Sequence, residues 1–294
     1  MSWLQVEFIV TPDRLEALEA AMFAAGCVSI ALVSESDEAV LEPAPGEMHL
    51  WRSVRAQGLF PLSIDLSDLR ILAKEGGLNA ELTFIGQQDW QGYARSFATD
   101  EIFADRIHLR PPLSEGESYE SDQLLPLFLE PGLAFGSGSH PTTRLCLDWI
   151  AKNVFAGSKV LDFGCGSGIL AIAAALLGAE VVAVDHDEQA VTATIDNARI
   201  NEVGNRVRAV NLNTWLANRD SGFDVIVANI LAGPLRELAG EFVQAAKPNG
   251  VIVLAGLLTD QVDDVQSAYP TAVDFVSADR VEGWVRLVGV SGVL

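Results

Sequence analysis

The sequence has little cysteine, and its three cysteines, Cys27, Cys146 and Cys165, stand far apart. An odd number of scattered cysteines excludes a disulfide framework, and their spacing does not match a zinc-binding pattern. Structural disulfides belong to oxidising compartments, so this usage favours a reducing environment. We therefore expect a cytoplasmic protein without a metal site.

Long apolar runs and basic residues are also scarce. The longest apolar run, residues 169–177, is about half of the roughly 18 residues that a membrane helix needs, and the first residues lack the pattern of a secretory signal. Lys and Arg number 19 against 40 Asp and Glu, for a formal net charge of −21. A negative charge of this size repels nucleic acid. We interpret it mainly as a contribution to solubility, and it would also attract a basic protein. We expect neither a membrane nor a nucleic-acid partner.

Residues 1–88 contain predicted elements in the order strand, helix, strand, strand, helix, strand. Residues 3–10 alternate like a half-buried strand, Pro12 marks the start of the first helix, and residues 66–74 form the second. The order predicts a small α+β domain of ferredoxin-like type. Residues 89–125 are predicted to connect it to the rest, through a short helix over 89–97 and a turn-rich acidic loop.

From residue 126 to residue 294, apolar strands alternate with Ala-rich helices. Strands are expected at 159–163, 180–185, 206–210, 223–228, 250–255, 272–277 and 284–290, and helices at 141–152, 168–178, 187–201, 233–246 and 259–268. This alternation predicts a Rossmann-like doubly wound α/β sheet. Because no helix separates the last two strands, the final strand is expected to be antiparallel.

A glycine-rich turn in residues 159–168 (KVLDFGCGSG) joins the first of these strands to a helix. Gly164 and Gly166 permit a tight turn and the close approach of a ligand, and the following helix N-terminus offers N–H groups. Seventeen residues after Gly168, the next strand ends in Asp185, a carboxylate placed to bind the two hydroxyls of a ribose. The pattern predicts a nucleoside-cofactor site.

Two details of the turn distinguish a dinucleotide from other nucleoside cofactors. The spacing is Gly-x-Gly-x-Gly, whereas dinucleotide-binding turns have the spacing Gly-x-Gly-x-x-Gly. Asp162 stands just before the turn, where a carboxylate would repel a diphosphate but would suit an ammonium group. S-Adenosylmethionine carries such a group together with an adenosine. A tight strand–helix turn without any ligand is the less favoured alternative.

Two further segments bring polar groups to the same edge of the predicted sheet. In residues 131–143, Thr143 is placed either to bind the amino-acid end of the cofactor or to cap a helix, and Phe135 to pack on the adenine. His140 is a candidate base, although capping and packing are commoner roles at a helix start. The fourth strand ends at Asn229, whose uncharged amide oxygen is suited to orient an amine. An Asn that only ends a strand in a turn is the alternative.

Six segments of the chain resemble the ribosomal protein L11 methyltransferase family, and together they span nearly its whole length. They are residues 3–6, 26–30, 42–47, 131–143, 162–170 and 229–235. The resemblance implies a class I methyltransferase that uses S-adenosylmethionine to methylate lysine side chains and the N-terminal α-amine of ribosomal protein L11. It implies cofactor contacts at Thr143, Gly164, Asp185 and Asn229. Gly166 is a further candidate contact, and no general base is assigned.

The connector departs from the family pattern, because a Trp and a His-Pro pair expected after Trp90 and a further Trp expected near Arg110 are absent. Alternatives are a related methyltransferase with another protein or amine substrate, a nicotinamide-dependent oxidoreductase and a non-enzymatic adenosyl sensor. The oxidoreductase would share the glycine turn and Asp185 but would not account for residues 229–231 or for the loop of residues 135–143. A monomer is expected.

Overall fold

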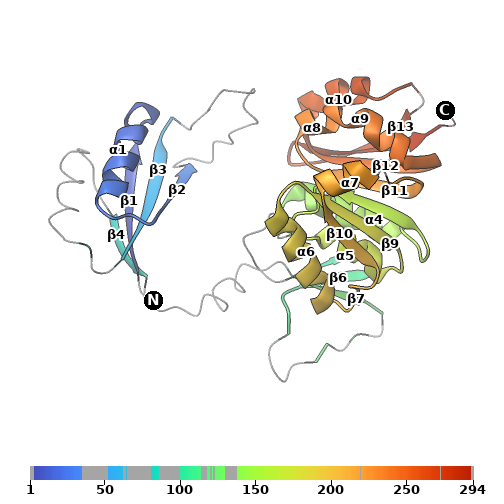
Figure 1. Ribbon diagram of the computed structural model, residues 1–294, viewed down its shortest axis with the longest axis horizontal. Coiled ribbons are helices and arrows are strands. Elements are labelled where there is room, and N and C mark those ends of the chain that lie inside the picture. Colours follow the sequence, from blue (N-terminus) through green and yellow to red (C-terminus); the bar gives the residue numbers. More distant parts are fainter. Residues whose placement is uncertain are drawn as a thin grey trace. The chain divides into compact units, whose positions relative to one another are not determined.

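The computed structural model of the protein describes residues 3–34, 52–61, 64, 81–85, 100–113, 118–119, 121, 123–129, 138–218, 220–271 and 273–292. The chain divides into two compact units, residues 1–90 and 91–294 (Figure 1). The helices predicted at 66–74 and 89–97 lie outside the described residues, as does Phe135. Within the described part of the chain, no helix has the length and apolar character needed to cross a membrane.

The first unit is an antiparallel sheet with a helix packed against it. Its elements are β1 (Trp3–Val10), α1 (Pro12–Ala24), β2 (Ser29–Ser34), β3 (Val54–Pro61) and β4 (Glu81–Ile85). The strand order β2-β3-β1-β4 places the first strand between the third and the fourth, as a ferredoxin-like fold requires. Val6, Phe8 and Val10 alternate into a core with Met22 of α1. Gly58 permits this packing, because a Cβ there would lie 2.1 Å from the Met22 side chain.

The second unit contains a seven-stranded sheet with the order β10-β9-β8-β11-β12-β14-β13. Its strands are β8 (Lys159–Phe163), β9 (Glu180–Asp185), β10 (Val207–Asn211), β11 (Phe223–Asn229), β12 (Ala246–Leu258), β13 (Val273–Val281) and β14 (Trp284–Ser291). The first five strands in this order are parallel, and β14 is antiparallel to both of its neighbours. The predicted doubly wound sheet with an antiparallel last strand is thus confirmed. Its order reverses between β8 and β11, where the carboxyl ends of strands in such sheets form a ligand crevice.

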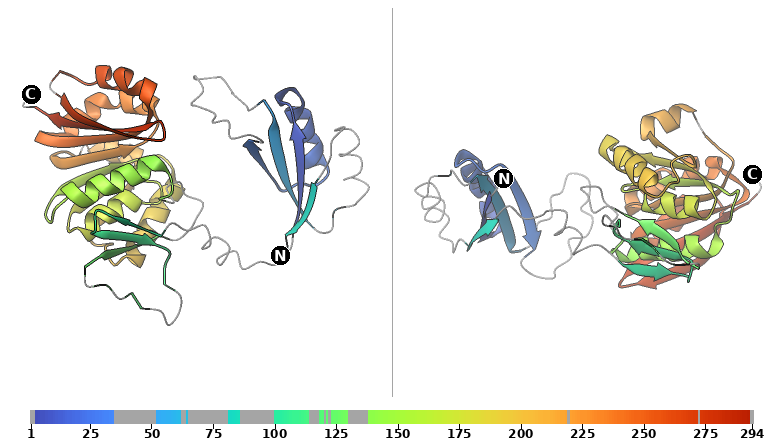
Figure 2. Two further views of the ribbon diagram at one scale, coloured as in Figure 1. Left: turned by 180° about the vertical axis from the view of Figure 1, so that it is seen from behind. Right: turned by 90° about the horizontal axis from the view of Figure 1, so that it is seen from below.

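Helices cover both faces of this sheet (Figures 1 and 2). One face carries α4 (Pro141–Asn153), α5 (Ile169–Leu176) and α6 (Glu188–Ile200). The other carries α7 (Leu212–Asn218), α8 (Ala232–Glu237), α9 (Ala239–Ala245) and α10 (Val262–Ala268), and the short helix η1 (Thr259–Gln261) precedes α10. Successive residues of a strand point to opposite faces, so Val160 of β8 lies in one core cluster and Leu161 in the other. Burial on both faces holds the strand ends in fixed positions.

A small three-stranded sheet also belongs to the second unit, and the sequence did not predict it. It consists of β5 (Glu101–Phe103), β6 (Ile107–Arg110) and β7 (Leu125–Phe128) in the order β5-β6-β7. Leu109 and Leu127 enter the same core cluster as α4 and α5. Asn201, which follows α6, donates to the backbone oxygen of Phe128 at 2.6 Å and accepts from its N–H at 2.7 Å. Part of the stretch predicted as a connection is therefore packed structure.

Two helices differ from the sequence prediction. The helix predicted over 233–246 is divided into α8 and α9 at Leu238, beside Gly240, which is a weak helix former. The short helix α7 was not predicted, because seven residues are too few to establish a helical period. Neither difference moves the strand ends that carry the predicted site.

Candidate active site

The turn between β8 and α5 depends on its glycines. Gly164, Gly166 and Gly168 have positive φ angles of 77°, 53° and 81°. The N–H of Gly164 donates to the backbone oxygen of Val184 on β9 at 2.7 Å, which fixes the turn against the neighbouring strand. A Cβ at Gly164 would lie 2.2 Å from the side chain of Ile230, which follows β11. The turn therefore stays close to the residues after Asn229, and a larger side chain would push them apart.

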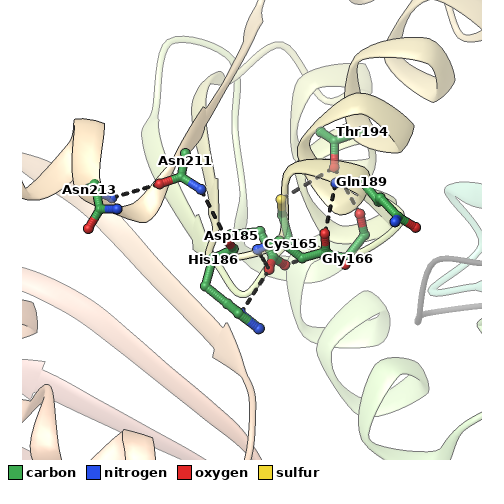
Figure 3. A network of polar contacts seen from close by, with 9 residues as sticks. Cys165, Gly166, Asp185, His186, Gln189, Thr194, Asn211 and Asn213 are labelled. Carbon is green, nitrogen blue, oxygen red and sulfur yellow. Dashed lines mark hydrogen bonds and ion pairs between the residues drawn. The ribbon is translucent and has the colours of Figure 1, made fainter.

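Asp185, at the end of β9, holds this turn in place (Figure 3). Its Oδ2 accepts from the N–H of Gly166 at 2.9 Å, and its Oδ1 accepts from the N–H of Asp187 at 3.0 Å. The Oγ1 of Thr194, on α6, also stabilises the turn, because it donates to the backbone oxygen of Gly166 at 3.1 Å. Oδ1 also lies 3.2 Å from the Nδ1 of the exposed His186, whereas Oδ2 has further acceptor capacity, which a ribose diol needs. The sequence pattern had not shown that the same carboxylate also shapes the turn.

Asp162, at the carboxyl end of β8, is almost completely buried, with 1% of its surface exposed. Its Oδ2 accepts from the N–H of Ala171 at 2.9 Å, whereas its Oδ1 is buried without a hydrogen-bond partner. The pKa of Asp162 is raised to about 7, because burial and the charge of Asp185 raise it more than the N–H of Ala171 lowers it. A buried carboxylate oxygen without a partner fits a cationic ligand, because a nearby positive charge favours the ionised form.

The structure brings Thr143 and Asn229 together across 86 residues of sequence. The Nδ2 of Asn229, at the end of β11, donates to the Oγ1 of Thr143, in the first turn of α4, at 3.3 Å. Because this bond uses the amide nitrogen, the amide oxygen is the acceptor that Asn229 can offer to an incoming amine. The alternative of Thr143 as the helix cap is wrong: the N-cap of α4 is His140, whose Nδ1 accepts from the N–H of Thr142 at 3.4 Å.

The segment after Asn229 is held by β12. The N–H of Ile230 donates to the backbone oxygen of Ala255 at 3.1 Å. Gly256 has a φ of +89°, and a Cβ there would lie 2.3 Å from the backbone oxygen of Ile230. This close packing, which no sequence pattern indicated, fixes the position of the amide that the site requires.

Five of the six predicted site residues thus lie at the carboxyl edge of the sheet or at the start of α4. They are Thr143, Gly164, Gly166, Asp185 and Asn229. The sixth, Phe135, lies outside the described residues. Among the described residues no cluster of His, Cys, Asp and Glu could hold a metal ion. Cys27, Cys146 and Cys165 are buried free thiols.

The site fits S-adenosylmethionine. The positive φ angles of the glycines form a tight turn beside Asp185, which presents oriented carboxylate oxygens, and Asp162 has a buried oxygen suited to a cation. Together with the strand order, this arrangement defines a class I methyltransferase that uses S-adenosylmethionine.

The family follows from comparison with known proteins. The family model for "Ribosomal protein L11 methyltransferase (PrmA)" matches residues 2–291. A ribosomal protein L11 methyltransferase of Pseudomonas aeruginosa is 39% identical over 294 residues, covering 98% of each chain. One from Azotobacter vinelandii is 38% identical over 295 residues, covering 99% of each. The chain belongs to the ribosomal protein L11 methyltransferase family.

A solved structure agrees with this membership. The crystal structure of ribosomal protein L11 methylase from Lactobacillus delbrueckii subsp. bulgaricus superposes with a TM-score of 0.58 at 30% identity. The match covers 67% of this chain and all of that chain.

Cofactor affinity is expected to fall at acidic pH because of Asp162. With a pKa near 7, this carboxyl is largely protonated below pH 7 and cannot attract an ammonium group. Affinity for S-adenosylhomocysteine, which carries the same ammonium group, should fall about tenfold per pH unit below 7. The ligand-free protein should show the opposite trend. A carboxyl whose folded pKa lies above its unfolded value of about 3.9 loses stability as pH rises from about 4 to 7.

Titration calorimetry between pH 5.5 and 8 measures this dependence. Experiments in two buffers of different ionisation enthalpy should also show proton release on binding near pH 7. Asp162→Asn should abolish both the proton release and the pH dependence. An affinity that is independent of pH in the wild type would contradict the role of Asp162.

Proposed function

We propose that this enzyme transfers methyl groups from S-adenosylmethionine to lysine side-chain amines and the N-terminal amine of ribosomal protein L11. The observation that carries the proposal is the hydrogen bond between Asn229 and Thr143, which leaves an uncharged amide oxygen at the crevice beside the glycine turn. Family membership supports the same substrate. Mass spectrometry of L11 after incubation with enzyme and cofactor tests the proposal, and an unchanged mass would contradict it.

Each polar residue of the site has a distinct part in this proposal. Asp185 would bind the ribose hydroxyls, Gly164 and Gly166 would leave room for the backbone to contact the cofactor, and Thr143 would bind its amino-acid end. When bound, S-adenosylmethionine supplies a methyl group on a positively charged sulfur. A neutral amine can accept this methyl group, and the sulfur is the leaving group. Asn229 would orient that amine through its amide oxygen, so that the nitrogen lone pair is aligned.

The amine must lose its proton before it can react. A lysine amine has a pKa of about 10.4, so its deprotonation at pH 7.4 costs about 4 kcal/mol. A crevice with little water and a nearby positive charge lowers this cost by disfavouring the ammonium form. We assign no base role to His140, whose Nδ1 interacts with the Oγ1 of Thr142 at 2.7 Å and caps α4. Solvent would take the proton before the amine enters.

A different substrate is the alternative to test. A related methyltransferase would modify another protein or a small amine, and product analysis with L11 as the only substrate distinguishes the two. The match to a methyltransferase family over residues 2–291 excludes a nicotinamide-dependent oxidoreductase, and Asp162 lies buried next to the turn where a diphosphate would bind. The acidic chain, with a net charge of −21, suits a basic protein substrate. We place the enzyme in the cytoplasm as a monomer.

Removal of the first unit is expected to separate cofactor binding from substrate recognition. We propose that residues 1–90 bind L11, so a chain of residues 91–294 should keep its affinity for the cofactor. Its methyl transfer to L11 should fall about 100-fold or more, because a tethered binding unit raises the effective substrate concentration. The cut must precede β5, since a later start would remove Phe103 and Leu109 from the core.

Calorimetry with S-adenosylhomocysteine and mass spectrometry of L11 measure the two properties separately. Loss of both would show that the shortened chain is not folded, which circular dichroism would reveal. Full activity of the shortened chain on L11 would refute the role of the first unit.

A further inference from the structure

An aromatic pair lies at the start of α4, the helix that also carries Thr143, the hydrogen-bond partner of the Asn229 amide. The ring of Trp284, the first residue of β14, packs on His140 with the ring centroids 4.7 Å apart and an interplanar angle of 72°. Trp284 is half-buried and His140 is exposed. His140 caps α4, but this alone does not explain why a tryptophan meets it at the carboxyl edge of the sheet.

Strand register places Trp284 on the same side of the sheet as Asn229. Asn229 of β11 pairs with Ala255 of β12, which in turn pairs with Arg286 of β14. The side chain of Arg286 points to α4, where its Nη1 donates to the backbone oxygen of Leu145, and the side chain of Asn229 points to α4 as well. Trp284 precedes Arg286 by two residues and so shares its face. Trp284 pairs with Leu258, the last residue of β12, so it lies nearer than Arg286 to the carboxyl edge of the sheet, where it contacts His140 at the start of α4.

The surroundings of the aromatic pair suit a cation. The two-residue turn between β13 and β14 consists of Glu282 and Gly283, both with positive φ, and Glu282 is exposed. Burial lowers the pKa of His140, while the negative charge of Glu282 opposes this shift, so the imidazole is neutral at pH 7. A neutral imidazole, an indole and a nearby carboxylate attract a positive charge, and none of them repels it.

A cation of this kind arises from the reaction itself. The amide oxygen of Asn229 can hold an amine only through an N–H group. Each added methyl group replaces one N–H, so the neutral dimethylamine that accepts the third methyl group has none, and positive charge develops on its nitrogen as the methyl group moves over from the sulfur. The face of an aromatic ring binds an alkylated ammonium ion without needing a hydrogen-bond donor. A site that adds several methyl groups to one nitrogen therefore needs a second kind of contact besides the amide.

We propose that Trp284 and His140 form an aromatic wall that holds the substrate nitrogen as its methyl groups accumulate, and so determine how many methyl groups one amine receives. The proposal rests on the function proposed above. It assigns Trp284 as a specificity-determining residue for the later transfers, next to the amide that orients the first.

The test follows L11 by intact-protein mass spectrometry over time, with S-adenosylmethionine in excess. Trp284→Leu should slow the second and third transfers about tenfold relative to the first, so that partly methylated products accumulate. Trp284→Phe keeps an aromatic face and should restore most of the loss. His140→Asn keeps a helix-capping oxygen but removes the second ring, and it should slow the later transfers in the same way.

Phe155→Leu is the matched control, because Phe155 is an exposed aromatic residue just beyond the opposite end of α4. It should leave both the rates and the products unchanged. Calorimetry with S-adenosylhomocysteine should show that each variant retains the cofactor site. If Trp284→Leu does not fold, the methylated products of His140→Asn test the proposal by themselves.

The outcomes separate this inference from the function on which it rests. A wild-type enzyme that leaves L11 unmodified contradicts the proposed function. A wild-type enzyme that stops at one methyl group overturns the aromatic wall, and so do variants whose products match those of the wild type. Accumulation of partly methylated L11 in Trp284→Leu and its reversal in Trp284→Phe support the wall.

Discussion

Asn229→Ala is expected to slow methyl transfer to ribosomal protein L11 by about 100-fold, with a much smaller loss of cofactor affinity. The amide is held by Thr143 at 3.3 Å, and its oxygen would align the amine with the methyl group. Without it, the nitrogen can still enter the crevice, but few of its orientations are productive. The effect should therefore appear mainly in kcat at saturating cofactor.

Single-turnover kinetics with excess enzyme and cofactor measure this step directly. Asn153→Ala serves as the control, since Asn153 ends the same helix that carries Thr143 and its side chain donates to the backbone oxygen of Trp149. Thr143→Val keeps the shape of Thr143 but cannot accept the bond from Asn229. It should produce a smaller loss in the same direction. Near-normal turnover of Asn229→Ala would show that the amide does not orient the substrate.

Asp185→Ala is expected to weaken binding of S-adenosylmethionine by about 100-fold or more. Two charge-assisted hydrogen bonds to a ribose diol contribute about 3 kcal/mol together, which corresponds to this factor. The variant also loses the bonds that hold the N–H groups of Gly166 and Asp187, so the turn itself becomes less ordered. Once the site is saturated with cofactor, the rate of methyl transfer should change far less.

Asp185→Asn separates the two roles of this carboxylate. The amide oxygen can still accept from Gly166, so the turn should remain ordered while one acceptor and the charge are lost. Asp187→Asn is the control: Asp187 is a nearby carboxylate that accepts from the N–H of Gln189 at the start of α6, and asparagine is an equally good cap. If Asp185→Ala binds the cofactor as tightly as the wild type in calorimetry, Asp185 is not the ribose ligand.

The glycine turn and Asp185 could be predicted from sequence because their signals are local. A strand that runs into three alternating glycines and a helix requires only neighbouring residues, and the position of Asp185 follows from the length of one helix and one strand. The doubly wound sheet was predictable for the same reason. Each of its strands is a short apolar run, and each run is bounded by a turn or a helix signal.

The pairing of Thr143 with Asn229 could not be predicted from local patterns. It depends on how α4 crosses the end of β11, and this is set by packing between elements far apart in sequence. Trp284 was not recognised for a similar reason. Its position next to His140 appears only once β14 has paired antiparallel with β12.

The small sheet was missed because its strands are very short. β5 has three residues and β6 and β7 have four each, which is too few for an alternation of apolar and polar residues to be distinguished from chance. Pro111 and Pro112 then follow β6 directly and indicate a loop. Burial of Ile107 and Leu109 in the core cluster that includes α4 and α5 supplies the stability that the sequence pattern does not show.

The most direct measurement is a crystal structure of the protein with S-adenosylhomocysteine. The ribose hydroxyls should contact the carboxylate of Asp185, the ammonium group should lie near Asp162, and the sulfur should face Asn229 and Thr143. A ligand bound elsewhere, or with its ribose away from Asp185, would contradict the proposed methyl-transfer site.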